Sequence, residues 1–134
     1  EGLFRKFVAD CADEYVIGSA GVSAYDGSPA SESTIQALLE EGLDASSHRS
    51  RRLTARMVEE ADRIYVMERL HRDLILQVWP GATPKVLLLR EVLKNVGSNP
   101  NDLDIPDPIG MSDYFYKNVL LVIRDCIEQI AANR

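Results

Sequence analysis

An aspartate between two prolines is the residue of this sequence best suited to acid–base chemistry. The segment Asp104-Ile105-Pro106-Asp107-Pro108 lies in a long stretch without a regular pattern, ahead of an amphipathic helix. Each proline fixes its own φ and favours extended geometry in the residue before it, so Asp107 has a stiff support. A general acid depends first on reach and orientation, which such a support supplies. Asp107 is therefore a candidate catalytic acid; the alternative is a solvated Asp-Pro turn.

Three further loop residues could support or line such a site. Ser19 begins the small-residue segment Ser19-Ala20-Gly21, where its hydroxyl can bond to a neighbouring loop, although a tight strand exit would look the same. His48 begins the run His48-Arg49-Ser50-Arg51-Arg52, which either suits an anionic partner or is a solvated basic loop. Tyr25 could form a pocket wall for a flat substrate, or only pin its own loop.

Neither cysteine is a convincing nucleophile. Cys11 and Cys126 lie in apolar helical patterns, and neither is followed by a glycine-rich stretch and an arginine that could bind phosphate. The sequence has no Cys-x-x-Cys and no Cys/His cluster with metal-ligand spacing, so we expect no metal site and no cofactor. We interpret both cysteines as reduced core residues.

The composition predicts one globular domain over residues 1–134, with 46% hydrophobic and 27% charged residues. No apolar run approaches the roughly 20 residues of a membrane-spanning helix, so we expect no membrane association and a cytoplasmic location. The net charge of −6 gives no general attraction to nucleic acid. The sequence leaves the oligomeric state open.

Alternating helix and strand patterns predict an α/β domain with a parallel sheet covered on both faces. We expect buried strands over residues 14–20, 63–67 and 85–89. We expect helices over residues 1–12 and 68–78. Three more helices should begin after caps at Ser33 (with Gln36), Thr54 and Ser112, and Gly42 should end the helix that Ser33 caps. No strand precedes the first helix, although a strand-to-helix turn is where such folds usually bind ligands.

In chain order, five segments resemble the low-molecular-weight protein tyrosine phosphatase family. They are residues 1–6 (the helix after the family's phosphate loop), Ser19-Ala20-Gly21 (its second-strand signature), Gly42-Leu43-Asp44 with residues 48–54 (its His-x-x-Arg-x-x-Thr stretch), residues 62–67 (its third strand) and Asp107-Pro108-Ile109-Gly110 (its acid loop). The resemblance implies a three-layer α/β sandwich with a small parallel sheet flanked by helices. It also implies that the family's first strand and Cys-x5-Arg loop lie before Glu1, so that the domain is incomplete at its N-terminus.

The chemistry implied by the resemblance is two-step hydrolysis of a phosphate monoester through a phosphocysteine intermediate. By position, Asp107 is the general acid and base, Ser19 and His48 brace the phosphate loop, and Tyr25 and Ile109 line the substrate pocket. The implied partner is a phosphorylated protein or a small aryl phosphate. Without the upstream cysteine loop, residues 1–134 are predicted to be inactive.

One departure from the family pattern leaves the substrate open. Ile109-Gly110 replaces the aromatic residues that follow the family's Asp-Pro, which removes a ring that would stack on phosphotyrosine. Bacterial relatives with altered pockets act on phosphoarginine, so a protein-arginine phosphatase is a second interpretation. A non-catalytic phosphoprotein-binding domain is a third, and the residues before Glu1 would discriminate it from an enzyme.

Overall fold

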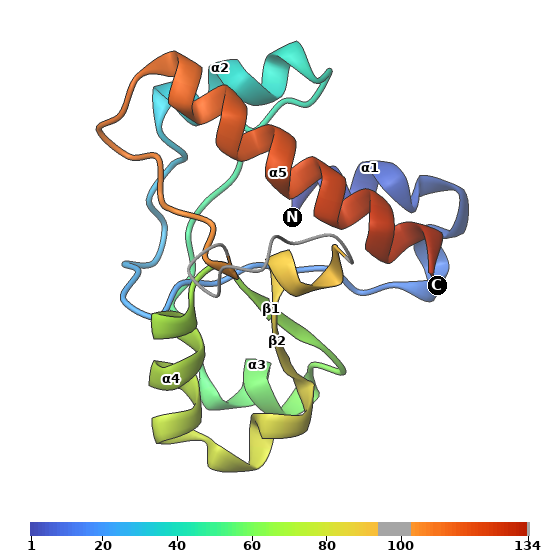
Figure 1. Ribbon diagram of the computed structural model, residues 1–134, viewed down its shortest axis with the longest axis vertical. Helices are drawn as coiled ribbons and strands as arrows, with labels where there is room; N and C mark the ends of the chain where they lie inside the picture. Colours follow the sequence, from blue (N-terminus) through green and yellow to red (C-terminus); the bar gives the residue numbers. More distant parts are fainter. Residues whose placement is uncertain (94–102, 134) are drawn as a thin grey trace.

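The computed structural model describes residues 1–93 and 103–133, where a two-stranded parallel sheet lies between two groups of helices (Figure 1). Strand β1 (Ile64–Val66) pairs with β2 (Val86–Leu88), with Ile64 opposite Val86 and Val66 opposite Leu88. Helix α4 (Arg69–Val78) and the 3-10 segment η2 (Pro80–Lys85) connect the two strands. The structure confirms the predicted α/β class and the two strands at residues 63–67 and 85–89.

One face of the sheet packs against α4 and the short helix α3 (Ala55–Glu60). Val66 and Leu88 lie in one buried cluster with Val58 of α3 and Ile75 of α4. The Thr54 hydroxyl accepts the backbone N–H of Met57 at 3.3 Å and caps α3, as predicted. Along each strand, side chains that face this layer, such as Val66 and Leu88, alternate with side chains that face the opposite layer.

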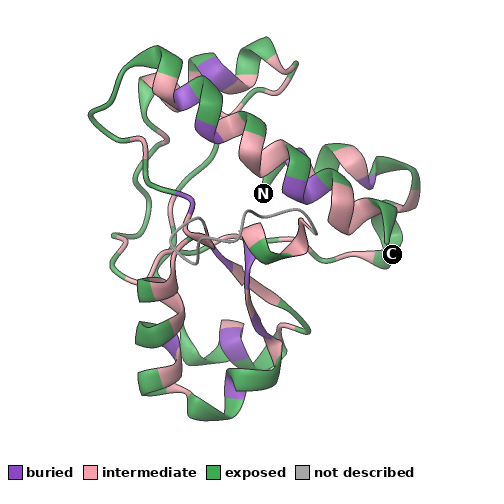
Figure 2. Cartoon of the chain, viewed as in Figure 1, coloured by how far each residue is buried: buried purple, intermediate pink, exposed green. Residues whose placement is uncertain are grey.

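The second face is covered by α5 (Asp113–Ala132), the longest helix described. Val119 and Cys126 pack with Leu89, at the start of the 3-10 segment η3 (Leu89–Val92), and with Ile105. Figure 2 shows buried positions on both strands, on α4 and along α5. The Ser112 hydroxyl accepts the backbone N–H of Phe115 at 3.2 Å, which confirms the predicted cap.

Two shorter helices contact α5 and differ in detail from the prediction. Helix α1 (Gly2–Phe7) is shorter than the expected 1–12, and the 3-10 segment η1 (Ala9–Glu14) follows it with non-helical φ and ψ at Cys11. Helix α2 (Glu32–Glu40) is capped by Ser31, whose hydroxyl accepts from the Thr34 N–H, so the predicted cap at Ser33 is wrong. Gly42 ends α2 with a φ of +78°, which favours glycine, as predicted.

The predicted strand over residues 14–20 does not form among the described residues. Val16 is fully exposed, and the only strand-like pairing nearby is the isolated bridge between Gly21 and Arg52. An apolar pattern shows that a segment could be buried in a sheet, but a strand also needs a neighbour to pair with its backbone. Separately, none of the helices within residues 1–93 and 103–133 has the length and apolarity to cross a bilayer.

Candidate functional site

The Asp-Pro loop (residues 104–110) is anchored at the point where β1 ends and α4 begins. The Ile105 N–H donates to the Met67 carbonyl at 2.8 Å, and the Ile105 side chain is buried in the α5 cluster. The Asp104 carboxylate accepts the backbone N–H of Arg69 at 2.8 Å and its Nε at 3.2 Å. The bond from the Arg69 N–H, aided by its guanidinium, lowers the pKa of the Asp104 carboxyl. The loop therefore has a fixed base.

Beyond this base, Asp107 is exposed and organised by a local turn. Its Oδ1 accepts the backbone N–H of Ile109 at 3.0 Å, and the Met111 N–H donates to the Pro108 carbonyl at 2.9 Å. Gly110 closes the turn with a φ of +77°, where a side chain would be strained. Oδ2 of Asp107 has no partner among the described residues, so a proton carried there can be given to a substrate. The adjacent Ile109 side chain is 70% exposed.

Ser19 lies between the start of α1 and an arginine. Its hydroxyl donates to Oε1 of Glu1 at 2.6 Å, and its carbonyl accepts from Nε of Arg51 at 3.3 Å. Partial burial alone would raise the pKa of the Glu1 carboxyl, but the bonds from Ser19 and Arg5 outweigh burial and hold that pKa low. The Ser19 hydroxyl therefore bonds to a carboxylate in this structure, and its role as a support for a phosphate loop stays a prediction.

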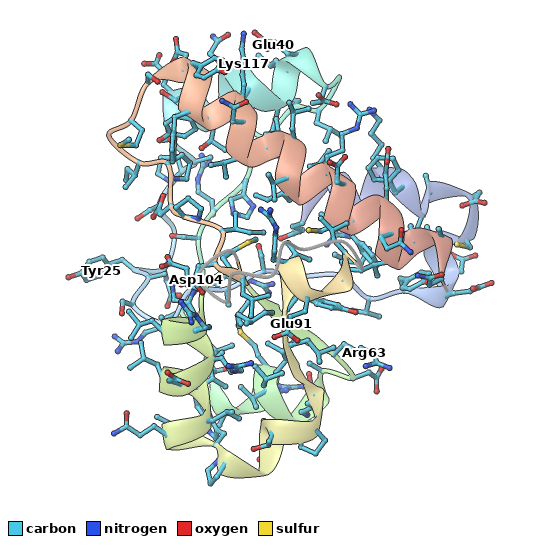
Figure 3. The ribbon with its side chains drawn as sticks, in the orientation of Figure 1. Tyr25, Glu40, Arg63, Glu91, Asp104 and Lys117 are labelled. Carbon is cyan, nitrogen blue, oxygen red and sulfur yellow. The ribbon has the colours of Figure 1, made fainter. Side chains whose placement is uncertain are left out.

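Tyr25 and His48 lie on two loops that are bonded together. Ser50 in the basic loop (residues 48–52) donates its hydroxyl to the Tyr25 carbonyl and accepts the Ser28 N–H at 3.1 Å. Asp26 accepts the Arg52 N–H at 2.8 Å. The Tyr25 ring is 83% exposed and points away from the body of the molecule (Figure 3). The His48 imidazole is exposed and has no hydrogen bond within the described part of the chain.

The loop that carries Ser19 and Tyr25, the basic loop and the Asp-Pro loop meet near the carboxyl end of β1 (Figure 1). Val22, Leu53 and Leu103, one from beside each loop, all pack against the cluster that contains Val66. The structure links Ser19 and Tyr25 to the basic loop and Asp107 to Ile109, but no hydrogen bond joins Asp107 to Ser19, Tyr25 or His48 among the described residues. Loops at this edge of a parallel sheet are where α/β proteins bind ligands.

Sequence reasoning missed three residues that hold these loops in place. Arg69, Ser50 and Arg51 each bond to a partner far along the chain, as described above. No local pattern predicts such pairs. A weak signal existed for Ser50, because it is the one small residue within a run of arginines.

The cysteines lie away from this site. Cys126 is completely buried in the α5 cluster, where burial raises the pKa of its thiol, and Cys11 lies in η1; neither is in a disulfide. Within residues 1–93 and 103–133, no group of three His, Cys, Asp or Glu side chains is arranged to hold a metal ion. Neither cysteine thus belongs to the loops that carry Ser19, Tyr25, His48 and Asp107.

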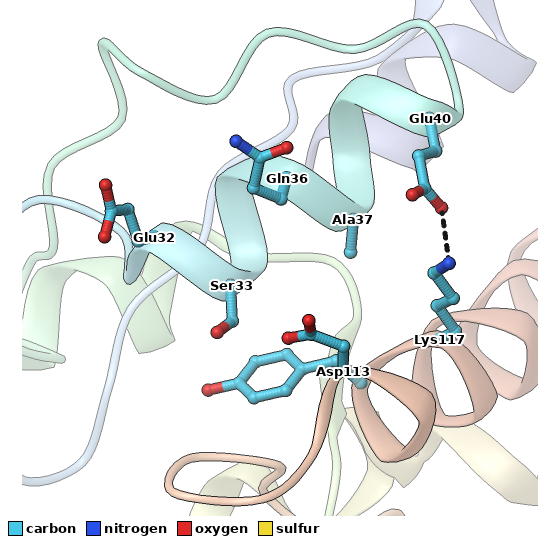
Figure 4. A pocket seen from close by; sticks show the side chains of 8 residues that line it. Glu32, Ser33, Gln36, Ala37, Glu40, Asp113 and Lys117 are labelled. Carbon is cyan, nitrogen blue, oxygen red and sulfur yellow. Dashed lines mark ion pairs between the residues drawn. The ribbon is translucent and has the colours of Figure 1, made fainter.

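A cavity of about 450 Å³ lies elsewhere, between α2 and the start of α5 (Figure 4). Glu32, Glu40 and Asp113 line it, and Lys117 pairs with Glu40 at 3.3 Å. An excess of carboxylates repels a phosphate dianion, so this cavity is unsuited to a phosphorylated substrate.

The fold is that of the small α/β phosphatases. The family model for low molecular weight phosphotyrosine protein phosphatase matches residues 1–133, and the chain belongs to this family.

Relatives of two substrate classes match the chain. The probable low molecular weight protein-tyrosine-phosphatase EpsP of Ralstonia nicotianae is 31% identical over 84% of this chain and 67% of its own length. A protein-arginine-phosphatase of Geobacillus stearothermophilus is 30% identical over 86% of this chain and 74% of its own. A solved cysteine-to-serine mutant of the arginine phosphatase YwlE, with a phosphorylated active-site serine, superposes with a TM-score of 0.88 at 26% identity, covering 99% of this chain and 84% of that one. The chain is therefore that of a protein phosphatase.

Proposed function

We propose that this protein hydrolyses phosphotyrosine in proteins through a phosphocysteine intermediate, with Asp107 as the general acid and base. The proposal rests on the hydrogen bonds that fix the Asp107 loop and orient its carboxylate. Its loop is bonded at its base to Met67 and Arg69, and one carboxylate oxygen is held by the Ile109 N–H while the other is open. A carboxyl oriented in this way can donate a proton without first being ordered.

The proposed reaction has two steps. A thiolate attacks phosphorus, an S–P bond forms, the P–O bond to the phenol breaks, and Asp107 gives its proton to the leaving oxygen. Water then attacks phosphorus, Asp107 takes a proton from it, and the S–P bond breaks to release phosphate and the thiolate. The phosphorylated active-site serine of the YwlE mutant supports such a covalent step in that relative.

The proposal requires a nucleophile outside residues 1–134, since neither Cys11 nor Cys126 is followed by x5-Arg. We propose that a Cys-x5-Arg loop is braced by Ser19 and His48 and that Tyr25 and Ile109 line the substrate pocket. The exposure of Tyr25, His48 and Ile109 supports this, because none of these side chains is occupied in the core. The substrate is a cytoplasmic phosphoprotein, an assignment supported by two cysteines that form no disulfide with each other.

The second candidate function is protein-arginine phosphatase. Ile109-Gly110 offers no aromatic ring to stack on a phosphotyrosine, and a protein-arginine-phosphatase is among the relatives. For this substrate Asp107 would protonate the leaving guanidine nitrogen instead of a phenol oxygen. Turnover of one peptide carrying either phosphotyrosine or phosphoarginine at the same position separates the two functions.

The test uses the protein from its complete reading frame, with Asp107→Asn and, as a control, Asp62→Asn on an exposed aspartate outside the loops. We expect Asp107→Asn to lower kcat for phenyl phosphate by about 10²–10⁴-fold, and Asp62→Asn to leave it unchanged. Residues 1–134 alone should show no turnover. Undiminished kcat in Asp107→Asn would refute the acid assignment. Binding of phosphopeptides without any turnover would favour the non-catalytic domain.

A further inference from the structure

The basic loop carries positive charge that the fold does not neutralise. Arg49 and Arg51 use their guanidiniums on backbone carbonyls only: Arg49 on those of Ser46 and His48, Arg51 on that of Ser19. The Arg52 side chain has no hydrogen bond or ion pair to any described residue. The Asp26 carboxylate accepts the Arg52 backbone N–H, not a guanidinium.

Most other described arginines pair with carboxylates, whereas Arg63 and Arg90 form no ion pair with a described residue. Five of them form ion pairs at 3.5 Å or less: Arg5 with Glu1, Arg56 with Glu60, Arg69 with Asp104, Arg72 with Glu91 and Arg124 with Glu41. The chain has 21 acidic and 15 basic residues, so carboxylates are plentiful. Arg49, Arg51 and Arg52 are exposed, and none of them forms an ion pair with a described residue. Together they form a positively charged surface that an external anion could bind.

The basic loop adjoins the proposed substrate pocket. Ser50 bonds to the Tyr25 carbonyl, and the Gly27 N–H donates to the Ser50 carbonyl at 2.8 Å. Arg49 and Arg51 flank Ser50 in the chain, so the backbone that carries them is joined to the loop that carries Tyr25. A peptide whose phosphorylated side chain contacts Tyr25 would therefore have its neighbouring residues near the basic loop.

We propose that the basic loop binds acidic residues close to the phosphorylated side chain of a protein substrate. This inference rests on the proposed function, because it assumes that the pocket beside Tyr25 is the one used. Aspartate and glutamate side chains fit the guanidinium fork in bidentate fashion. The net charge of −6 opposes association with a long polyanion or an anionic bilayer, but a short acidic segment contacts only the local positive surface.

The first experiment follows backbone amide NMR signals of the complete protein at about 20 mM salt, where the Debye length exceeds 20 Å. The probe is an unphosphorylated peptide with a tyrosine between pairs of glutamates, and the comparison peptide has serines in their place. We expect signals of residues 48–52 to shift with the glutamate peptide only. The shifts should be lost in R49A/R52A, kept in R49K/R52K, and kept in the control R56A/R63A. Arg63 lies on the far side of the molecule from Tyr25 (Figure 3).

The second experiment measures kcat/KM for the phosphotyrosine forms of the same two peptides. We expect kcat/KM to be about tenfold higher for the glutamate peptide, the size of effect that two exposed charge contacts would give. This ratio should fall to about one in R49A/R52A and at high salt. Equal kcat/KM values, with phenyl phosphate still turned over, would overturn this inference and leave the proposed function standing. Shifts at residues 48–52 without any turnover would support the acidic-peptide surface and overturn the proposed function. The same shifts with an RNA oligonucleotide or anionic vesicles would overturn the choice of an acidic protein segment.

Discussion

The Asp104 carboxylate bridges two parts of one arginine, the backbone N–H of Arg69 at 2.8 Å and its Nε at 3.2 Å. Arg69 is the first residue of α4, where helix N–H groups have no partner within the helix. Asp104 thus caps α4 from a distant loop and places a negative charge at the positive end of the helix. The same contact fixes the base of the loop that carries Asp107, so helix stability and site geometry depend on one side chain.

Replacing Asp104 by alanine should destabilise the protein in a pH-dependent way. The variant should lose about 1 kcal/mol of unfolding free energy at pH 7, the size of a lost cap with a partly exposed ion pair. Because the pKa of Asp104 is lowered in the folded state, this contribution is present above the unfolded pKa of about 3.9 and disappears as pH falls through the folded pKa. Urea denaturation at pH 7 and at pH 2.5 measures it.

The matched control is Asp73→Ala, an exposed aspartate on the same helix without a bond to any described residue. It should change the unfolding free energy by less than about 0.5 kcal/mol at both pH values. A loss in Asp104→Ala that stays equally large at pH 2.5 would show that charge is not its cause.

Much of the fold follows from patterns that lie close together in the sequence. The caps at Thr54 and Ser112 were predictable because each hydroxyl accepts from the backbone N–H of a residue only three positions later. Ser31 and Ser33 both satisfy that pattern, and only the extended φ and ψ of Ser31 select it, which the sequence does not reveal. The strand at residues 14–20 was wrong because its apolar residues carry no information about a neighbour.

The stiffness of the Asp107 loop was predictable from the sequence, but the long-range hydrogen bonds that hold the candidate site loops in place were not. The prolines beside Asp107 indicated a stiff loop, and the turn at Ile109 and Gly110 agrees with that. The bond from Arg69 to Asp104 joins residues 35 positions apart, and the bond from Ser50 to Tyr25 joins residues 25 apart. Such pairs depend on packing of the whole sheet, which a local pattern does not encode.

Gly21 should tolerate a methyl group poorly, whereas Gly18 should tolerate it. An added Cβ at Gly21 would lie 2.8 Å from Cβ of Ala24, in a segment fixed by backbone bonds to Arg51 and Leu53. At Gly18 the Cβ would lie 2.6 Å from Nη2 of Arg51, the end of a flexible side chain that can move. Gly21→Ala should therefore lower the unfolding free energy by about 1–2 kcal/mol more than Gly18→Ala does in urea denaturation. Equal losses would contradict the rigid contact at Ala24.

Ser50→Ala should open the Tyr25 loop locally without unfolding the domain. The variant loses the bond to the Tyr25 carbonyl and the acceptor of the Ser28 N–H. We expect the Ser28 amide to exchange with deuterium about fivefold faster, which corresponds to about 1 kcal/mol of local opening. Ser47→Ala, an exposed serine of the neighbouring turn, is the control and should leave that exchange rate unchanged. Unaltered exchange in Ser50→Ala would mean that other contacts hold the loop.

Cys126 should behave as a protected thiol whose ionisation weakens the fold. Burial, with a smaller effect from Asp125, raises its pKa, and the nearby Arg90 opposes this only in part. Because its pKa is raised in the folded state, the protonated Cys126 thiol contributes to the free energy of unfolding below the unfolded thiol pKa of about 8.5. This contribution is lost as pH rises through the folded-state pKa. Cys126→Ala should thus cost about 1 kcal/mol at pH 7, and the difference should shrink above pH 9. Ellman's reagent at pH 8 should modify the partly exposed Cys11 of the native protein before Cys126, and Cys126 only after urea is added; modification of both at the same rate would contradict the complete burial of Cys126.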